Sequence, residues 1–245
     1  MAGHSKWANI KHRKGRQDAK RGKLFAKLIK AIESAARNGG GDISANPTLA
    51  TAVQKAKDNS VPKDNIDRAI ARGSGDVDGV DYLETFYEGY APGGVALFVQ
   101  ILTDNRNRAA SDVRAAFNKN GGNLGEPGSV GYLFEQKGHI LAVGDEDVVM
   151  LAALEGGAED IVDGGDVWEV TSSPSDLGTV RSTLESAGVT IESSVVTYLP
   201  STSVPVDAAT APKVLRLVDA LEDLDDVQAV FANFDIPDDV LATLE

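Results

Sequence analysis

The 245-residue chain contains no cysteine and only three histidines, and these absences exclude several kinds of site. Without cysteine there is no disulfide framework, no thiol nucleophile and no thiolate ligand for zinc. The longest apolar run, residues 148–154, is far shorter than the roughly 20 residues that span a membrane. The N-terminus leads into charged residues rather than an apolar segment, unlike a secretory signal. We therefore expect a soluble, cytoplasmic protein with no membrane partner, no metal and no cofactor.

Acidic residues outnumber basic ones overall, but the two signs are distributed unevenly along the chain. The formal net charge is −13, with 24 Lys and Arg against 37 Asp and Glu. Residues 1–75 hold 16 of the basic residues and 6 of the acidic ones, a balance of +10, whereas residues 76–245 have a balance of −23. Such a division predicts a polyanion-binding module joined to an acidic body.

Three amphipathic helices are predicted in the basic part, because apolar residues recur there every three or four positions. Asn46 is a helix-capping residue followed by Pro47, which is favoured at a first helical position. Gly73 is expected just past the end of the third helix. Residues 1–19 show little periodicity and are predicted to be an arm that an anionic partner would order. The helices are expected at about residues 20–38, 47–59 and 63–72.

Beyond a linker at residues 74–79, the apolar spacing changes toward that of strands. From residue 138 the predicted order is strand, helix, strand, strand, helix, strand, which is the plan of a ferredoxin-like plait. The segment before it is predicted to contain a hairpin at 82–90 and 95–102, a helix at 107–118, a glycine-rich loop at 121–131 and a strand at 132–136. A last helix at 209–221 and strand at 227–234 would complete that earlier segment.

The predicted fold class is therefore α+β. An N-terminal three-helix domain is followed by two ferredoxin-like (α/β plait) domains, with the third domain inserted into the second. The expected boundaries are residues 1–78 for the helical domain, 79–137 plus 205–245 for the discontinuous plait, and 138–204 for the insertion.

No arrangement of residues typical of an enzyme stands out, so we expect a non-enzymatic protein. His139 is the one histidine on a predicted strand, and we interpret it as an ordinary polar residue of that strand. The acidic residues 222–226 lack the alternation of a calcium loop and are predicted to be a solvated helix end. The glycine-rich segments 39–41 and 121–125 follow predicted helices, whereas a phosphate-binding loop precedes its helix. Both segments are therefore predicted to be turns. An enzyme acting in a cleft between the plaits stays as an alternative that lacks a nucleophile.

The basic residues of the N-terminal part form a candidate nucleic-acid-binding set. Lys20, Lys23, Lys27 and Lys30 are spaced three, four and three residues apart, on one face of the first helix, where they suit a phosphate backbone. Trp7 either stacks on an exposed base or docks onto the protein, and the arm as a whole could be merely solubilising. The candidate residues are Lys6, Trp7, Lys11, His12, Arg13, Lys14, Arg16, Lys20, Arg21, Lys23, Lys27 and Lys30.

A second basic cluster lies in the acidic body at Arg106, Arg108 and Arg114. It either extends the nucleic-acid surface or pairs with neighbouring residues such as Asp104 and Asp112. The third helix carries acids as well as arginines, unlike a helix that reads bases in the major groove. Binding dominated by the phosphate backbone is therefore expected, and this leaves DNA and RNA equally open.

Several segments resemble the YebC/PmpR family. The opening MAGHSKWANIKHRK of residues 1–14 is closely similar to the start of that family. The further matches are KLFAKLI at 23–29, PKDNI at 62–66, YEGY at 87–90, TDNRNR at 103–108 and GSV at 128–130.

The resemblance implies a three-domain cytoplasmic protein without a cofactor. Members are usually called probable transcriptional regulators that bind DNA. Mitochondrial relatives activate translation, and bacterial members have been linked to ribosomes and to translation through proline-rich stretches. The resemblance thus implies a DNA-binding transcriptional regulator or, as the alternative, a translation factor bound to ribosomal RNA. The chain departs from the family pattern in its very acidic C-terminal part, where Lys and Arg after residue 138 are limited to Arg181, Lys213 and Arg216.

Overall fold

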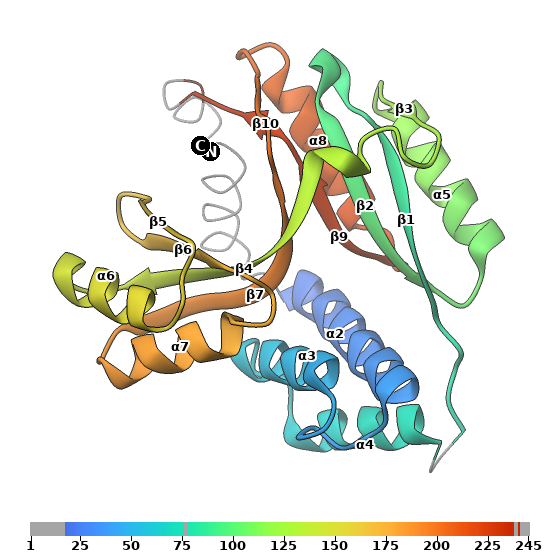
Figure 1. Ribbon diagram of the computed structural model, residues 1–245. Helices are drawn as coiled ribbons and strands as arrows, with labels where there is room; N and C mark the ends of the chain where they lie inside the picture. Colours follow the sequence, from blue (N-terminus) through green and yellow to red (C-terminus); the bar gives the residue numbers. More distant parts are fainter. Residues whose placement is uncertain (1–17, 76–77, 238–239, 241–245) are drawn as a thin grey trace. The chain divides into compact units, whose positions relative to one another are not determined.

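The computed structural model describes residues 18–75, 78–237 and 240, which divide into two compact units. The first unit consists of residues 1–134 together with 200–245, and the second of residues 135–199. The mixed α+β class predicted from the sequence is confirmed, with helices first and antiparallel sheets after them (Figure 1). Within the part of the chain that is described, no helix is both long enough and apolar enough to cross a membrane.

Among the described residues, the first unit begins with three helices: α2 (Asp18–Gly39), α3 (Pro47–Asp58) and α4 (Lys63–Ser74). Their apolar stripes meet in one cluster, in which Ile32 and Leu49 are fully buried. Asn46 joins two of the helices, because its Oδ1 accepts the N–H of Leu49 at the start of α3 while its Nδ2 donates to carbonyls near the end of α2. The capping residue predicted from the sequence therefore has a second role as a link between helices.

Gly73 corrects one expected helix boundary. It lies inside α4 rather than past its end, and Gly75 is the left-handed cap, with a φ of 86°. A Cβ on Gly73 would collide with the Glu33 carbonyl oxygen. The glycine is therefore needed for the close packing of α4 against α2, and not for the end of the helix.

A four-stranded sheet follows, with the order β3-β1-β2-β9. The predicted hairpin is present, since each residue of β1 pairs antiparallel with β2, from Leu83 opposite Thr103 to Tyr90 opposite Ala96. Helices α5 and α8 pack on one face of this sheet around a core that includes Leu97, Phe117 and Leu217 (Figure 1). The elements are β1 (Leu83–Tyr90), η1 (Pro92–Gly94), β2 (Ala96–Thr103), α5 (Arg106–Lys119), β3 (Asn123–Leu124), α8 (Ala211–Glu222) and β9 (Val227–Ala232). A short parallel pair, β8 (Val204–Pro205) with β10 (Phe234–Asp235), adds a small second sheet.

The strand predicted at residues 132–136 is wrong as an element of this sheet. The edge position next to β1 is taken by β3, which lies inside the glycine-rich loop. Residues 131–133 form the short helical turn η2 (Gly131–Leu133), and residue 134 begins β4, a strand of the other sheet. The loop is held by Glu88, whose carboxylate accepts the N–H groups of Gly128, Val130 and Gly131, each at 2.7 Å.

The second unit has the predicted ferredoxin-like plan. Its elements are β4 (Phe134–Val143), α6 (Glu146–Glu155), β5 (Asp160–Asp163), β6 (Trp168–Ser172), α7 (Leu177–Ser186) and β7 (Thr190–Pro200). The sheet order β5-β6-β4-β7 places the first strand between the third and the fourth, as in that fold. Both helices pack on one face of the sheet, over Ile140 and Val170 (Figure 1).

Candidate nucleic-acid interface

The predicted nucleic-acid-binding residues fall into two groups. Lys20 and Arg21 lie in the first turn of α2, and Lys23, Lys27 and Lys30 follow on the same helix. The residues of the arm lie outside the described residues, namely Lys6, Trp7, Lys11, His12, Arg13, Lys14 and Arg16.

The three lysines Lys23, Lys27 and Lys30, here called the α2 lysine row, contact the last residue of α8 and the turn that follows it. Lys27 Nζ donates to the carbonyl oxygen of Glu222 at 2.5 Å, and Lys23 Nζ donates to that of Asp223 at 3.0 Å. The last carbonyls of a helix have no partner within the helix and carry its negative dipole end. Lys23 and Lys27 therefore act as an external cationic cap on α8, and the whole lysine row fixes the helical domain to the plait within the first unit.

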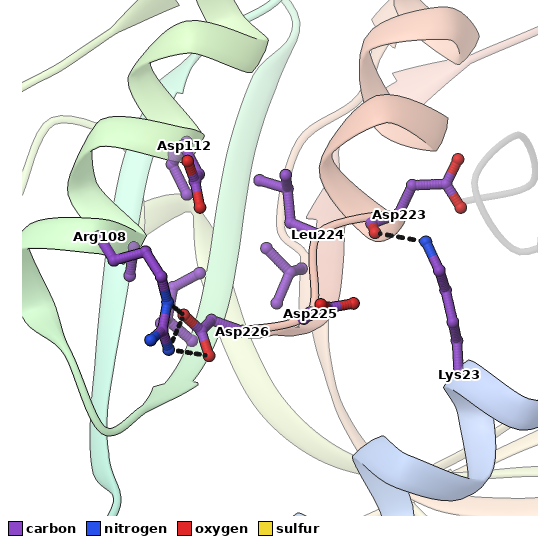
Figure 2. A pocket seen from close by; sticks show the side chains of 11 residues that line it. Lys23, Arg108, Asp112, Asp223, Leu224, Asp225 and Asp226 are labelled. Carbon is purple, nitrogen blue, oxygen red and sulfur yellow. Dashed lines mark hydrogen bonds and ion pairs between the residues drawn. The ribbon is translucent and has the colours of Figure 1, made fainter.

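Residues 222–226, here called the acidic turn, form the other side of this contact. The turn was expected to be a solvated helix end, and this is wrong for Asp226, which is only 7% exposed. Its carboxylate accepts Lys30 Nζ at 3.1 Å and Thr103 Oγ1 at 3.0 Å. It also accepts the Arg108 guanidinium at 2.8 Å (Figure 2). One buried carboxylate thereby joins α2, β2 and α5.

Hydrogen bonding decides the ionisation of Asp226. Burial alone would raise its pKa, but the hydrogen bonds from Arg108, Lys30 and Thr103 outweigh burial and hold the pKa below its ordinary value. On the facing helix, burial lowers the pKa of Lys27, against the opposing effect of Glu222 and its acidic neighbours.

A hollow of about 230 Å³ lies where α5 and the acidic turn meet the side chain of Lys23 (Figure 2). Four carboxylates line it, against only two cations. Such a lining repels phosphate, so the hollow does not serve as a phosphate site. The lining carboxylates are Asp112, Asp223, Asp225 and Asp226, and the cations are Lys23 and Arg108. Among the described residues, no group of three or more His, Cys, Asp or Glu is placed to hold a metal ion.

Two family models match most of the chain. Residues 5–76 match the family model for the "TACO1/YebC protein N-terminal domain", and residues 82–234 match that for the "TACO1/YebC second and third domain". The chain belongs to the TACO1/YebC family.

Its relatives in this family are similar over their full length. A protein of Beutenbergia cavernae is 58% identical over 250 residues, covering 100% of this chain and 99% of its own. One of Rubrobacter xylanophilus is 59% identical over 247 residues, covering 99% and 98%. Both carry the name "Probable transcriptional regulatory protein". A crystal structure of a conserved hypothetical protein from Aquifex aeolicus has a TM-score of 0.82 at 48% identity, covering 90% of this chain and 93% of that one.

The three arginines of the second basic cluster in this TACO1/YebC chain have different surroundings. Arg106 and Arg114 are exposed on α5. Arg108 instead donates to Asp104 at 2.6 Å and to Asp226, rather than to Asp112. Pairing is thus the outcome for Arg108, whereas the other two arginines face solvent.

Two cations that sequence reasoning missed flank the turn between α3 and α4. Lys57 and Lys63 are both exposed there. The charge count gave no signal for them, because residues 40–75 hold five Lys and Arg against four Asp and Glu. Periodicity did not distinguish these residues, because most of the exposed positions of α3 and α4 are polar.

Proposed function

We propose that this TACO1/YebC-family chain is a non-enzymatic regulator of gene expression that binds nucleic acid through its basic N-terminal part. The names of its relatives place them among transcriptional regulators, which makes DNA the first candidate target. The observation that carries the proposal is the concentration of positive charge in residues 1–75 of an otherwise acidic chain.

Contacts within the first unit leave fewer basic residues to bind nucleic acid. The α2 lysine row is engaged with the acidic turn, so these three lysines serve domain docking first. Upstream of that row, residues 1–22 still hold seven Lys and Arg against one Asp. We therefore assign the principal phosphate contacts to the arm and the first turn of α2. Exposed cations such as Lys57 and Lys63 are the candidates for additional contacts.

A second candidate target is ribosomal RNA, with the chain acting as a translation factor that eases elongation through proline-rich stretches. The observation that favours it is the character of α4, the helix that would read bases in a helix-turn-helix arrangement. Its exposed face carries Asp64 and Asp67 next to Arg68, and acids at these positions disfavour insertion into a major groove. Binding to the phosphate backbone does not need such a helix and suits RNA as well as DNA.

The test of nucleic-acid binding replaces Lys11, Arg13, Lys14 and Arg16 together with Ala. We expect weaker binding to every sequence and a flatter dependence of log affinity on log salt, by about one for each phosphate that is no longer neutralised. Affinity is measured by fluorescence anisotropy with a labelled duplex and a labelled RNA hairpin between about 50 and 300 mM salt, a range of roughly the size over which such contacts are resolved.

A matched control changes net charge by the same amount at another place. Replacing Lys213 and Arg216, both exposed on α8, with Glu also shifts the net charge by −4. This control should leave the salt slope almost unchanged. Equal losses in the two variants would mean that total charge rather than the arm governs binding, and an unchanged slope in the arm variant would overturn the assignment.

An experiment with ribosomes from a cell lysate distinguishes DNA from ribosomal RNA as the target. Cosedimentation of the tagged protein with ribosomes from a nuclease-treated lysate is compared at low and high salt, beside shift assays with promoter DNA. Salt-sensitive movement with ribosomes and only unspecific DNA shifts would establish the translation factor. Specific retention of one promoter against competitor DNA, with no protein in the ribosomal fraction, would establish the transcriptional regulator.

A further inference from the structure

Helix α6 of the second unit has apolar residues on its buried side and on its exposed side, and the largest of them are exposed. Its buried residues are small or of medium size: Val149, Ala152 and Ala153. Its exposed side presents Leu151 at 63% and Leu154 at 62% exposure. A helix that is apolar all round is normally covered on both sides. The second cover of α6 is therefore missing from the described residues.

The inner contact of α6 explains why only small residues are buried there. Helix α6 packs against α7 and the sheet, and a Cβ on Gly156, directly after α6, would come within 2.7 Å of the Val180 Cα. At this point the end of α6 lies too close to the backbone of α7 for any side chain. The outward leucines are thus not needed for the core of the unit. Val148 and Met150, 39% and 41% exposed, widen the apolar surface that they form.

The surroundings of this surface are strongly acidic. Residues 135–199 contain 13 Asp and Glu against only two Lys and Arg. Both of these cations are already neutralised, since Lys137 forms ion pairs with Glu135 and Glu159, and Arg181 pairs with Glu185. The acids nearest to the apolar surface in the chain are Glu146, Asp147 and Glu155, which are all exposed.

We propose that the outer face of α6, made of Val148, Met150, Leu151 and Leu154, docks a cationic amphipathic segment of a protein partner. The apolar side of that segment would cover the leucines, and its Lys or Arg residues would face the acidic ends of α6. Charge complementarity selects this occupant. A second copy of the same unit would bring two strongly negative surfaces together, and an anionic membrane or a nucleic acid would be repelled in the same way.

The size of the surface sets the strength of the contact. Ten residues of helix are about 15 Å long, so the face covers less than the roughly 800 Å² that each partner contributes to a stable interface. The contact is therefore weak and reversible by itself, with a dissociation constant on the order of micromolar.

The test uses the full chain and a designed probe. The probe is a fluorescent 18-residue helical peptide, a length of about five turns, with Leu spaced three and four residues apart and Lys elsewhere. A peptide of the same composition in scrambled order has no apolar face, and a third peptide carries Glu in place of Lys. Anisotropy should show saturable binding of the first peptide and little binding of the other two.

Two double variants decide whether α6 is the site. Leu151→Ser with Leu154→Ser should weaken binding of the Leu/Lys peptide about tenfold or more, because both anchors of the face are removed. The matched control is Ile43→Ser with Leu83→Ser, which removes two exposed apolar side chains from the first unit and should leave binding unchanged. As a further variant, Glu146→Gln with Glu155→Gln should weaken binding and reduce its salt dependence.

Other outcomes overturn the proposal. Equal binding by the two serine variants would mean general attraction to an acidic protein, with no site on α6. No saturable binding by the parent chain, together with a loss of its thermal stability in the leucine variant, would show that the chain itself covers this face. Thermal denaturation of each variant is measured for this reason. Neither outcome bears on nucleic-acid binding by the N-terminal part, which is tested separately.

Discussion

Replacing Asp226 with Asn tests the interpretation that one buried carboxylate holds the helical domain to the plait. Asn has the same shape, but it removes the negative charge that faces Lys30 and Arg108. Removing one partner from a buried ion pair costs about 3–5 kcal/mol, and a hydrogen bond to a charged group is worth about 1.5–3 kcal/mol. The Arg108 side chain is 47% exposed, and water screens its share of the interaction. We therefore expect the free energy of unfolding to fall by about 2–4 kcal/mol.

The same variant makes a prediction about pH. The folded-state pKa of Asp226 is lowered, so its contribution is present above the unfolded-state pKa of about 3.9 and is lost as the pH falls through the folded-state value. The difference in stability between the parent chain and the variant should thus be constant near neutral pH, shrink as the pH falls below the unfolded-state pKa, and disappear only below the lowered folded-state pKa.

Urea unfolding followed by circular dichroism, at several pH values, measures both effects. Asp225→Asn is the matched control, because its side chain is exposed and only its backbone carbonyl accepts Lys30. It should change stability by no more than about 0.5 kcal/mol. A loss below about 0.5 kcal/mol for the Asp226 variant, or a loss that does not vary with pH, would refute the role given to this carboxylate.

Two further substitutions test local links in the first unit. Asn46→Ala removes the cap of α3 and the hydrogen bonds to the end of α2, and should lower the free energy of unfolding by about 1–3 kcal/mol. The loss should be larger than for Asn59→Ala, because the Asn59 side chain donates to a single carbonyl. Denaturation of both proteins gives the comparison. Glu88→Gln leaves three backbone N–H groups facing an amide, so hydrogen exchange should quicken at residues 128–131 while α3 keeps its protection. Unchanged exchange at these amides would contradict the account of the loop.

Much of the fold could be predicted from local signals. The hairpin of β1 and β2 and the start of α3 depend on neighbouring residues, such as Asn46 before Pro47, and both are present where expected. Predictions failed where distant residues decide. The sequence predicts Gly73 past a helix end, but the glycine is needed inside α4 because the Glu33 carbonyl of α2 lies against it. The edge strand at residues 123–124 is too short to give an alternating pattern.

The candidate site could be predicted only in part, because helical spacing shows which residues share a face and not what lies opposite. Lys23, Lys27 and Lys30 share a face as expected. Lys30 also contacts the carbonyl of Leu102. The other partners are carbonyl oxygens and a carboxylate about 200 positions later in the chain, in a run that composition alone suggested to be solvated. The arm residues stay a prediction, since they lie outside the described residues.

The insertion of one unit into another has a consequence for the order of events during synthesis. Strand β9 pairs with β2, and α8 fills the core beside it, yet both follow the 65 residues of the inserted unit in the chain. The first unit therefore cannot close its core until that insertion has left the ribosome. At about 5–20 residues per second this delay lasts several seconds. At the end of this delay the contiguous insertion has all of its strands. The first hairpin still lacks β9 and α8 at that point, and the α2 lysine row still lacks the acidic turn.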